Sequence, residues 1–520
     1  MQKTTLNLVE NQLKPQESEP RPTIKQWSWL PITLILLLAT GLYFYQLGME
    51  SMWVDELYSI SDAKAIPETL PAIRPIYFVL LHLWMKFSTD VTWLRSLSVL
   101  FSLGSILLIY LLGRRIAGEA VGLIAALMLT LSPLFINFTQ MVRMYSLGTC
   151  LGLAGTLALV QALDNPTNKT MAWWAIMRVL MVLTAPLNAT LIIADILLFR
   201  WRFHQQRRIL LRFGKWLIVL IALWLPFLTT LISQTLPFLA GALDVTAKNA
   251  ASASRHDYPS ALEVIRKLKN FTAFPFPSPS KLMSLFYQGY TLMLVGLLAL
   301  APVKKHPSPP LLWITTWLLL PAGMIFLVSQ RLWVDRYILF LAPYLLILLA
   351  AGIVRIWHNQ RVVAIGLTLI YFVAVSGGLM RYYTVLDRQD WKGLAQAISL
   401  NDQSGDAIIL SGGSAAPKMT TGLTYYYRGD APIIVEPQLC STSNLKPSQV
   451  KSGIDSLPKS ASRFWLVCSS EFDPPQLQTW FADKLNLIKH QQFRNENFYR
   501  DNDYMHLLLT TKINHQGQEK

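Results

Sequence analysis

Residues 93–133 read WLRSLSVLFSLGSILLIYLLGRRIAGEAVGLIAALMLTLSP, two apolar runs separated by the basic triplet GRR at 113–115. A helix needs roughly 20 apolar residues to cross a lipid bilayer, and each run is close to that length. Short basic connections between such runs are typical of the cytoplasmic side of a membrane. This stretch therefore predicts two neighbouring transmembrane helices.

The composition extends this interpretation to the whole chain. Of its 520 residues, 52% are hydrophobic and 15% are charged, and the mean hydropathy is +0.36. Soluble domains carry about 25% charged residues. The net charge of +16 does not indicate nucleic-acid binding, because Lys and Arg lie mostly in short loops beside apolar runs. The sequence contains no Walker loop, no GxGxxG and no Cys/His spacing suited to zinc.

We expect a polytopic α-helical membrane protein with about 11 transmembrane helices, interfacial helices and a small C-terminal α/β extracytoplasmic domain. Residues 1–29 form a cytoplasmic tail, 30–380 the transmembrane domain and 381–520 the C-terminal domain. The first apolar run has no small-residue cleavage site, which favours a membrane helix over a cleaved signal peptide. The expected spans are 30–48, 93–113, 116–134, 145–163, 171–186, 187–200, 213–233, 284–302, 311–329, 337–354 and 362–380.

Residues 74–87, RPIYFVLLHLWMKF, are too short in their apolar part to cross a bilayer and predict an interfacial helix. With the N-terminus inside, this choice leaves the densest basic clusters on the cytoplasmic side, as the positive-inside rule requires. Those clusters are 113–115, 200–208, 304–305 and 355–361. The loops 49–92, 136–146, 234–283 and 329–337 then face outward, together with the C-terminal domain.

The C-terminal domain alternates short apolar runs with polar helical stretches. The runs at 406–410, 431–436, 463–469 and 504–511 predict strands, and 391–400 and 474–485 predict helices. Cys150 lies within an apolar run and is interpreted as a packing residue. Cys440 and Cys468 lie in the C-terminal domain, where they could pair in an oxidising compartment or remain free.

Unusual polar residues gather on the expected outer face. They include Asp55 and Glu56 in the stretch SMWVDELYSI, together with Arg74, His82, Arg143, Tyr145, Arg336 and Tyr337. Arginine offers a planar set of donors suited to phosphate oxygens, and a carboxylate can accept a proton from an attacking hydroxyl. The pattern fits transfer of a group from a lipid-linked phosphate to an alcohol. A solvated acidic loop, snorkelling arginines and a packing role for His82 remain open alternatives.

Four stretches resemble the GT-C class of membrane glycosyltransferases that use polyprenyl-phosphate sugars, in particular the protein O-mannosyltransferase and aminoarabinose-transferase superfamily and its bacterial members. They are MWVDELYS, the run from PIYFVLLHLWMKF through 93–133, FTQMVRMYSL and DRYILFLAPYLLIL. The start of the C-terminal domain, RQDWKGLAQAI followed by GDAIIL, is similar to that of bacterial members. The resemblance covers most of residues 30–410 and lies in the order and spacing of these motifs.

The resemblance implies inverting sugar transfer at the outer face of the inner (plasma) membrane, with Asp55 as general base. It implies that Arg143 with Tyr145, and Arg336 with Tyr337, lie near the donor phosphate or in the cavity wall. Glu56 matches a second acidic position with a supporting or metal-facing role. Some relatives bind a divalent cation, Mg or Mn, and others do not, so Asp55 and Glu56 are also metal candidates.

Arg74 departs from the family pattern and is a candidate either for an extra phosphate contact or for a determinant of the acceptor. The expected partners are a polyprenyl-phosphate sugar donor, the bilayer, and a glycan, lipid or protein acceptor; the sugar stays open between hexoses and pentoses. A multi-span transporter or flippase of lipid-linked or anionic substrates is the main alternative, because a charged cavity also describes a transport pathway. A non-catalytic envelope-assembly protein is a third.

Overall fold

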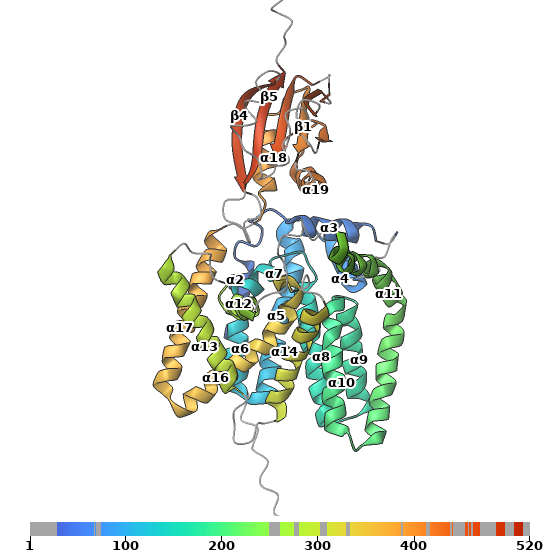
Figure 1. Ribbon diagram of the computed structural model, residues 1–520, viewed down its shortest axis with the longest axis vertical. Helices are drawn as coiled ribbons and strands as arrows, with labels where there is room; N and C mark the ends of the chain where they lie inside the picture. Colours follow the sequence, from blue (N-terminus) through green and yellow to red (C-terminus); the bar gives the residue numbers. More distant parts are fainter. Residues whose placement is uncertain are drawn as a thin grey trace, which may run out of the picture.

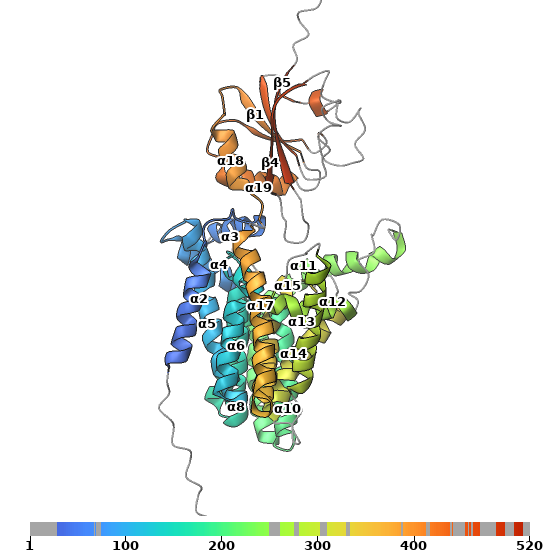
Figure 2. The same ribbon diagram turned by 90° about the vertical axis from the view of Figure 1, so that its left-hand side faces the viewer.

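The computed structural model describes residues 29–66, 68, 74–248, 261–274, 280–301, 309–328, 333–385, 388–411 and 416–436, and in the C-terminal part 439, 453–455, 457–458, 461–468, 485–494 and 504–512. It consists of a bundle of long helices with a smaller sheet domain beyond one end (Figures 1 and 2). The short helices α3 (Val54–Lys64) and α4 (Pro75–Met85) lie at that same end of the bundle.

Helices cover all eleven expected ranges. They are α2 (Leu30–Phe44), α5 (Val91–Ala117), α6 (Glu119–Leu131), α7 (Pro133–Thr139), α8 (Tyr145–Asp164), α9 (Asn168–Val182), α10 (Thr190–Phe203), α11 (Arg207–Lys248), α13 (Lys281–Leu300), α14 (Pro309–Val328), α15 (Asp335–Ile338), α16 (Ala342–Asn359) and α17 (Arg361–Thr384). In the described part, six helices are long and apolar enough to cross a membrane, or seven if the bent pair α6 and α7 is one span. The membrane-protein class is confirmed, and the count of eleven spans stays a prediction.

Residues 93–133 fold as the antiparallel pair α5 and α6. The turn between the two helices differs from the expected one at GRR. The GRR triplet belongs to the end of α5, where Arg114 and Arg115 lie in the last turn, and the chain reverses at Gly118 with φ +99°. Glycine adopts this backbone conformation without a side-chain clash. The two helices then approach closely, since a Cβ on Gly113 would lie 2.9 Å from the Cα of Gly122.

Two other expectations concern the outer segments. The segment at 74–87 forms α4, an eleven-residue apolar helix, and this length agrees with an interfacial position rather than a span. The expected loop 234–283 is largely helical in its described residues, because α11 continues to Lys248 and α12 spans Ala261–Thr272.

The C-terminal domain contains a mixed sheet in the order β2-β1-β3-β5-β4. Its strands are β1 (Asp406–Ser411), β2 (Ile433–Val435), β3 (Arg463–Cys468), β4 (Leu485–Arg494) and β5 (Tyr504–Lys512). Strands β2, β1 and β3 are parallel, while β5 is antiparallel to β3 and β4. The α/β interpretation and four strands are confirmed. The polar strand β4 was not predicted, and most of the expected helix 474–485 lies outside the described residues.

Helices α18 (Trp391–Ser399) and α19 (Ala416–Tyr426) cover one face of the sheet. The helix expected at 391–400 is therefore confirmed. The division of the chain at 380 stays a prediction; α17 ends at Thr384. Cys468 is disulfide-bonded and Cys150 is a free thiol, while Cys440 lies outside the described residues.

A fully buried ion pair joins the helices of the bundle. Arg178 on α9 contacts Asp195 on α10 through its Nε at 2.7 Å and a terminal nitrogen at 3.0 Å, and neither side chain is exposed. The indole N–H groups of Trp174 and Trp317 also donate to Asp195. Arg178 in turn donates to the carbonyl of Gly152 and to the hydroxyl of Thr156 on α8. The pair thus links α8, α9, α10 and α14 through groups that satisfy each other's hydrogen bonds.

We expect Asp195→Ala to lower the free energy of unfolding by about 3–5 kcal/mol, because Arg178 is left as an uncompensated buried charge. The double variant Arg178→Met/Asp195→Leu should recover most of this loss, since it removes both charges. Thermal unfolding in detergent measures both effects. A single variant as stable as the wild type would show that the pair does not hold the helices together.

Candidate functional site

The two adjacent carboxylates lie in the first turn of α3. Trp53 is the N-cap residue, and the backbone N–H of Trp53 donates to a carboxylate oxygen of Glu56 at 2.9 Å. Acidic side chains in a first turn are stabilised by the unpaired N–H groups and the positive end of the helix dipole. The sequence DE therefore starts the helix, and consecutive helical positions send the two side chains in different directions.

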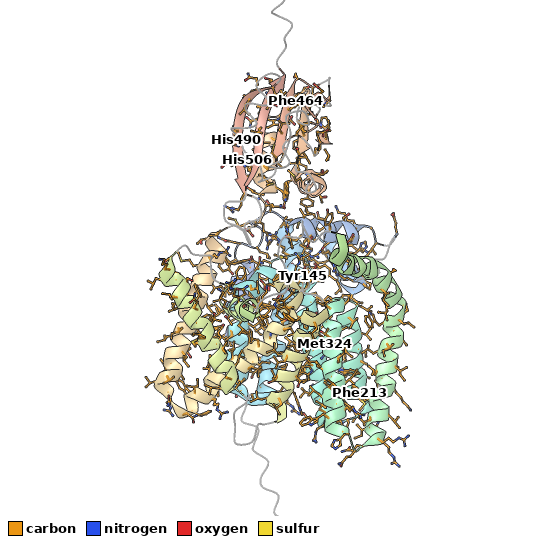
Figure 3. The ribbon with its side chains drawn as sticks, viewed as in Figure 1. Tyr145, Phe213, Met324, Phe464, His490 and His506 are labelled. Carbon is orange, nitrogen blue, oxygen red and sulfur yellow. The ribbon has the colours of Figure 1, made fainter. Side chains whose placement is uncertain are left out.

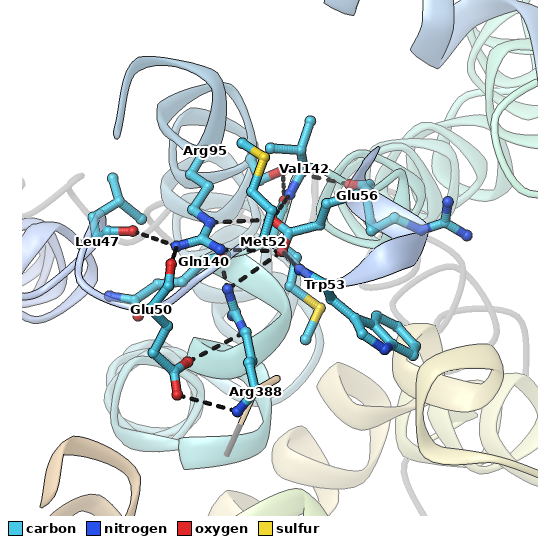
Figure 4. Close-up of polar contacts among 12 residues, drawn as sticks. Leu47, Glu50, Met52, Trp53, Glu56, Arg95, Gln140, Val142 and Arg388 are labelled. Atoms are coloured by element: carbon cyan, nitrogen blue, oxygen red, sulfur yellow. Dashed lines mark hydrogen bonds and ion pairs between the residues drawn. The ribbon is translucent and has the colours of Figure 1, made fainter. Parts of the chain in front are cut away.

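Glu56 points into the protein and is fully buried (Figure 4). Its carboxylate accepts hydrogen bonds from Arg95 at 3.0 and 3.1 Å and from the backbone N–H of Val142 at 2.8 Å. Arg388, which follows the last long helix, contacts the same carboxylate at 3.4 Å. Burial alone would raise the pKa of Glu56, but Arg95, Arg388 and these hydrogen bonds hold it below its ordinary value. This geometry gives Glu56 a supporting position rather than contact with a substrate.

Asp55 points the other way and keeps one third of its side-chain surface exposed. A terminal nitrogen of Arg143 lies 3.7 Å from its carboxylate. The other terminal nitrogen of Arg143 donates to the backbone carbonyl of Asp55 and to the hydroxyl of Ser59, each at 2.9 Å. Asp55 therefore has an open carboxylate edge on a backbone that Arg143 fixes.

Three arginines surround Asp55. Arg74, the N-cap residue of α4, lies close enough to Asp55 and Arg143 for electrostatic coupling. Burial, followed by the positive charge of Arg143, lowers the pKa of Arg74 below its ordinary value. The Arg336 guanidinium lies 5.5 Å from the ring centre of Trp53 and is coupled to Asp55. The site therefore has more positive than negative charge.

The aromatic neighbours of these arginines come from the same motifs. Arg143 lies over the ring of Tyr145 at 5.6 Å, and Arg336 lies over the ring of Tyr337 at 5.0 Å. Figure 3 shows Tyr145 near the end of the bundle that faces the sheet domain. Such cation–π contacts hold a guanidinium without using its N–H donors. Among the described residues, the Nε atoms of Arg74, Arg143 and Arg336 are buried and have no hydrogen-bond partner.

Asp335 anchors the helix that carries Arg336. Its fully buried carboxylate lies 2.6 Å from the Nζ of Lys267 and 3.5 Å from the side-chain nitrogen of Asn270, both on α12. The segment containing α12 thereby fixes the start of α15. Asp335 thus pairs with residues of α12 rather than with the adjacent Arg336, whose guanidinium lies near Asp55 instead.

His82 does not join this cluster through any contact among the described residues. Its Nδ1 lies 2.9 Å from the carbonyl of Ala63, so the ring ties α4 to the end of α3. This contact favours the packing role that the sequence left open. Arg74, Arg143, Tyr145, Arg336 and Tyr337 do come together around Asp55, as the motifs suggest.

Three nearby polar residues were not predicted. Ser59 and Asp62 follow Asp55 by four and seven positions, so they share its face of α3, and Asp62 is coupled to Arg74 and Arg143. The helical spacing of four and seven residues is a sequence signal that could have identified both Ser59 and Asp62. Arg388 lies in a polar linker, and no sequence signal connects it with Glu56, 332 positions earlier.

The donor set does not fit a divalent cation. Both oxygens of Glu56 are taken by hydrogen bonds, and Asp55 faces three guanidiniums whose positive charge opposes a second cation. In the described part of the chain, no group of three or more His, Cys, Asp and Glu side chains could hold a metal ion.

Comparisons with known proteins concern the fold of the chain and part of its sequence. Residues 71–232 match the family model described as dolichyl-phosphate-mannose-protein mannosyltransferase. The fold is similar to that of ArnT from Cupriavidus metallidurans, with a TM-score of 0.53, 12% identity, and coverage of 93% of this chain and 98% of that one. The family match covers under half of the chain, and the likeness to ArnT, at this low identity, shows that the two proteins share a fold.

A second solved structure has a similar fold. The archaeal oligosaccharyltransferase AglB from Archaeoglobus fulgidus matches with a TM-score of 0.53 and 12% identity, over 92% of this chain and 76% of that one. No curated protein matches the sequence. The arrangement of helices is thus shared with GT-C enzymes at low sequence identity.

We expect Glu56→Gln to lower the free energy of unfolding by about 3–5 kcal/mol, because it leaves the buried Arg95 without its counter-charge and leaves Arg388 with Glu50 alone. Asp55→Asn should change it by less than about 1 kcal/mol, since that carboxylate is partly exposed. Thermal unfolding of both variants in the same detergent makes the comparison. Equal stability of the two variants would contradict the division of roles.

The pH dependence of stability follows from the lowered pKa of Glu56. A carboxyl whose pKa is lowered in the folded state stabilises the fold above its unfolded pKa, about 4.3 for glutamate, and loses that contribution as the pH falls through the folded pKa. The difference in stability between wild type and Glu56→Gln should therefore be full at pH 6 and shrink below about pH 4.

Proposed function

We propose that the chain transfers a sugar from a polyprenyl-phosphate donor to a hydroxyl of an acceptor on the extracytoplasmic face of the plasma membrane. Asp55 is the general base and the anomeric configuration is inverted. The observation that supports this most directly is the cluster of Arg74, Arg143 and Arg336 beside the open edge of Asp55, because their buried Nε donors have no partner within the part of the chain that the structure describes. Buried unpaired donors are costly, and phosphate oxygens would satisfy them.

Two relatives support a lipid-phosphate donor. The ArnT of Cupriavidus metallidurans has a structure bound to undecaprenyl phosphate. The AglB of Archaeoglobus fulgidus has a structure in complex with an inhibitory peptide and a dolichol-phosphate. A long isoprenoid chain would lie along the apolar helices, with its phosphate at the end of the bundle where the arginines lie.

The proposed reaction is a single displacement. The acceptor oxygen attacks the anomeric carbon while the bond from that carbon to the phosphate oxygen breaks, and the acceptor proton passes to the carboxylate of Asp55. The products are the glycosylated acceptor and the polyprenyl phosphate. Arg143 and Arg336 stabilise the negative charge that the leaving phosphate gains, with Arg74 as an additional contact. No step requires a metal ion.

Tyr145 and Tyr337 form part of the same site. Their rings hold Arg143 and Arg336 from one side, which leaves the guanidinium edges to the phosphate. Glu56 acts indirectly by fixing the first turn of α3, and His82 by joining α3 to α4. The catalytic carboxylate is thus held in place by residues that do not contact the substrate.

The orientation of the site is part of the proposal. The basic clusters at the opposite end of the bundle favour a cytoplasmic position for that end. The disulfide at Cys468 supports an oxidising compartment for the sheet domain. A transporter or flippase would need its charged groups along a pathway across the membrane. Here Arg74, Arg143 and Arg336, whose Nε donors have no partner among the described residues, lie at one end of the bundle, and the buried pair Arg178 and Asp195 has its bonding groups satisfied.

We expect Asp55→Asn to reduce the rate of sugar transfer by about 10²–10⁴-fold, because an amide cannot accept the acceptor proton. Membranes containing the variant, supplied with a labelled polyprenyl-phosphate sugar, measure the rate. The control is Glu119→Gln, which changes an exposed carboxylate at the start of α6, away from the site, and should retain transfer within about threefold. Near-normal transfer by Asp55→Asn would reject the base assignment.

The orientation has a separate test. A reporter phosphatase that is active only in an oxidising compartment, fused after Met380, should be active. The same reporter fused at Gln206, between α10 and α11, should be inactive, because the neighbouring basic cluster favours the cytoplasm. The reverse pattern would place the site on the cytoplasmic face.

A further inference from the structure

We propose that the C-terminal domain holds the catalytic helix α3 in position and that Arg388 is the positioning residue that makes this connection. The inference rests on the proposed function, since it assigns Asp55 as the group that must be positioned. It gives the sheet domain a part in the reaction although none of its residues contacts Asp55 among those described.

Helix α3 lies between two hydrophobic cores. Leu57 and Ile60 are buried in the core of the helical bundle. Val54, the residue before Asp55, is buried instead in the core of the sheet domain with Trp391 and Leu423. Figures 1 and 2 both place α3 between the bundle and the sheet domain. The start of α3 is therefore packed against the sheet domain on one side and against the helical bundle on the other.

Polar contacts join the same two parts. The backbone N–H of Met52 donates to the hydroxyl of Tyr426 on α19 at 2.7 Å. The backbone N–H of Lys392 on α18 donates to the hydroxyl of Ser51 at 3.0 Å. These contacts fix the residues immediately before α3 to the two helices of the sheet domain.

Arg388 reaches into the protein from the linker between the domains. Its side chain contacts Glu50 at 3.2 Å and Glu56 at 3.4 Å, and donates to the carbonyl of Gln140 at 3.0 Å (Figure 4). It is buried. One guanidinium thus joins the segment before α3, the first turn of α3 and the loop that leads to Arg143.

The charges around Glu56 show why Arg388 can be tested without losing the fold. Glu56 also pairs with Arg95, which donates to the carbonyls of Leu47 and Ser51. Removing Arg388 leaves that pair intact and removes only the connection with the linker. The helix remains folded, and its first turn gains freedom to move.

This freedom matters for catalysis because Asp55 lies in that turn. Its backbone carbonyl accepts a hydrogen bond from Arg143, so a displaced turn moves both the base and a phosphate-binding arginine. Displacement of a reacting group by about 1 Å costs on the order of 10²-fold in rate. Donor binding depends on several arginines and should change much less.

The test compares Arg388→Gln with the wild type in two measurements. Hydrogen exchange of the backbone amides in residues 54–64 should become at least about tenfold faster in the variant, because the turn opens more often. For sugar transfer, kcat should fall about 10–100-fold while KM for the polyprenyl-phosphate donor stays within about threefold. Arg388→Lys should recover part of both losses. Arg428→Gln removes an exposed arginine of the sheet domain and is the control. It should change neither the exchange rates nor kcat.

A second variant tests the connection from the sheet domain without changing charge. Tyr426→Phe removes the hydroxyl that accepts the N–H of Met52 and should speed exchange at Met52 and in the first turn of α3. Tyr425→Phe is the matched control and should leave exchange unchanged. Unchanged exchange in both Arg388→Gln and Tyr426→Phe would overturn the proposal, as would faster exchange with normal kcat. A wild type that transfers no sugar would reject the proposed function, while exchange still decides whether the domain holds α3.

Discussion

The buried carboxylate of Glu56 is the contact on which the site depends. One side chain accepts bonds from the N-cap of its own helix, from a bundle helix through Arg95 and from the loop that leads to Arg143, and it also contacts the interdomain residue Arg388. A buried carboxylate is tolerated only when its bonding capacity is met, so this residue imposes a common geometry on four segments that are distant in sequence. The position of the neighbouring Asp55 carboxylate follows from these contacts.

The pair Asp55 and Glu56 shows how one short motif serves two needs. Adjacent positions on a helix differ by about 100° in direction, so one side chain faces the core and the other the site. Arginines balance the negative charge of Glu56 and its pKa is lowered, so it stays ionised, while the carboxylate of Asp55 keeps an exposed edge. Two residues of similar chemistry therefore take different roles because of their surroundings.

Much of this arrangement could be predicted from the sequence. Long apolar runs predicted the positions of the helices, and short apolar runs between polar helical stretches predicted four strands. The motifs around Asp55, Arg143 and Arg336 identified residues that come together in space. The rest depended on contacts that no local pattern carries. Arg388 lies in a polar linker, Arg178 and Asp195 lie in runs that otherwise read as apolar, and β4 is too polar to read as a strand. The role of Glu56 could not be separated from that of Asp55 before its burial was known.

The two sets of buried arginines explain what separates a structural charge from a functional one. Arg178 lies deep in the bundle, yet its donors meet Asp195, Gly152 and Thr156, so it has little left to offer a ligand. Arg74, Arg143 and Arg336 lie at the end of the bundle with buried Nε donors that lack partners among the described residues. Burial raises the free-energy cost of an unmet donor. An anion that binds there would offset this cost, and three such donors around the carboxylate of Asp55 support the proposed phosphate site.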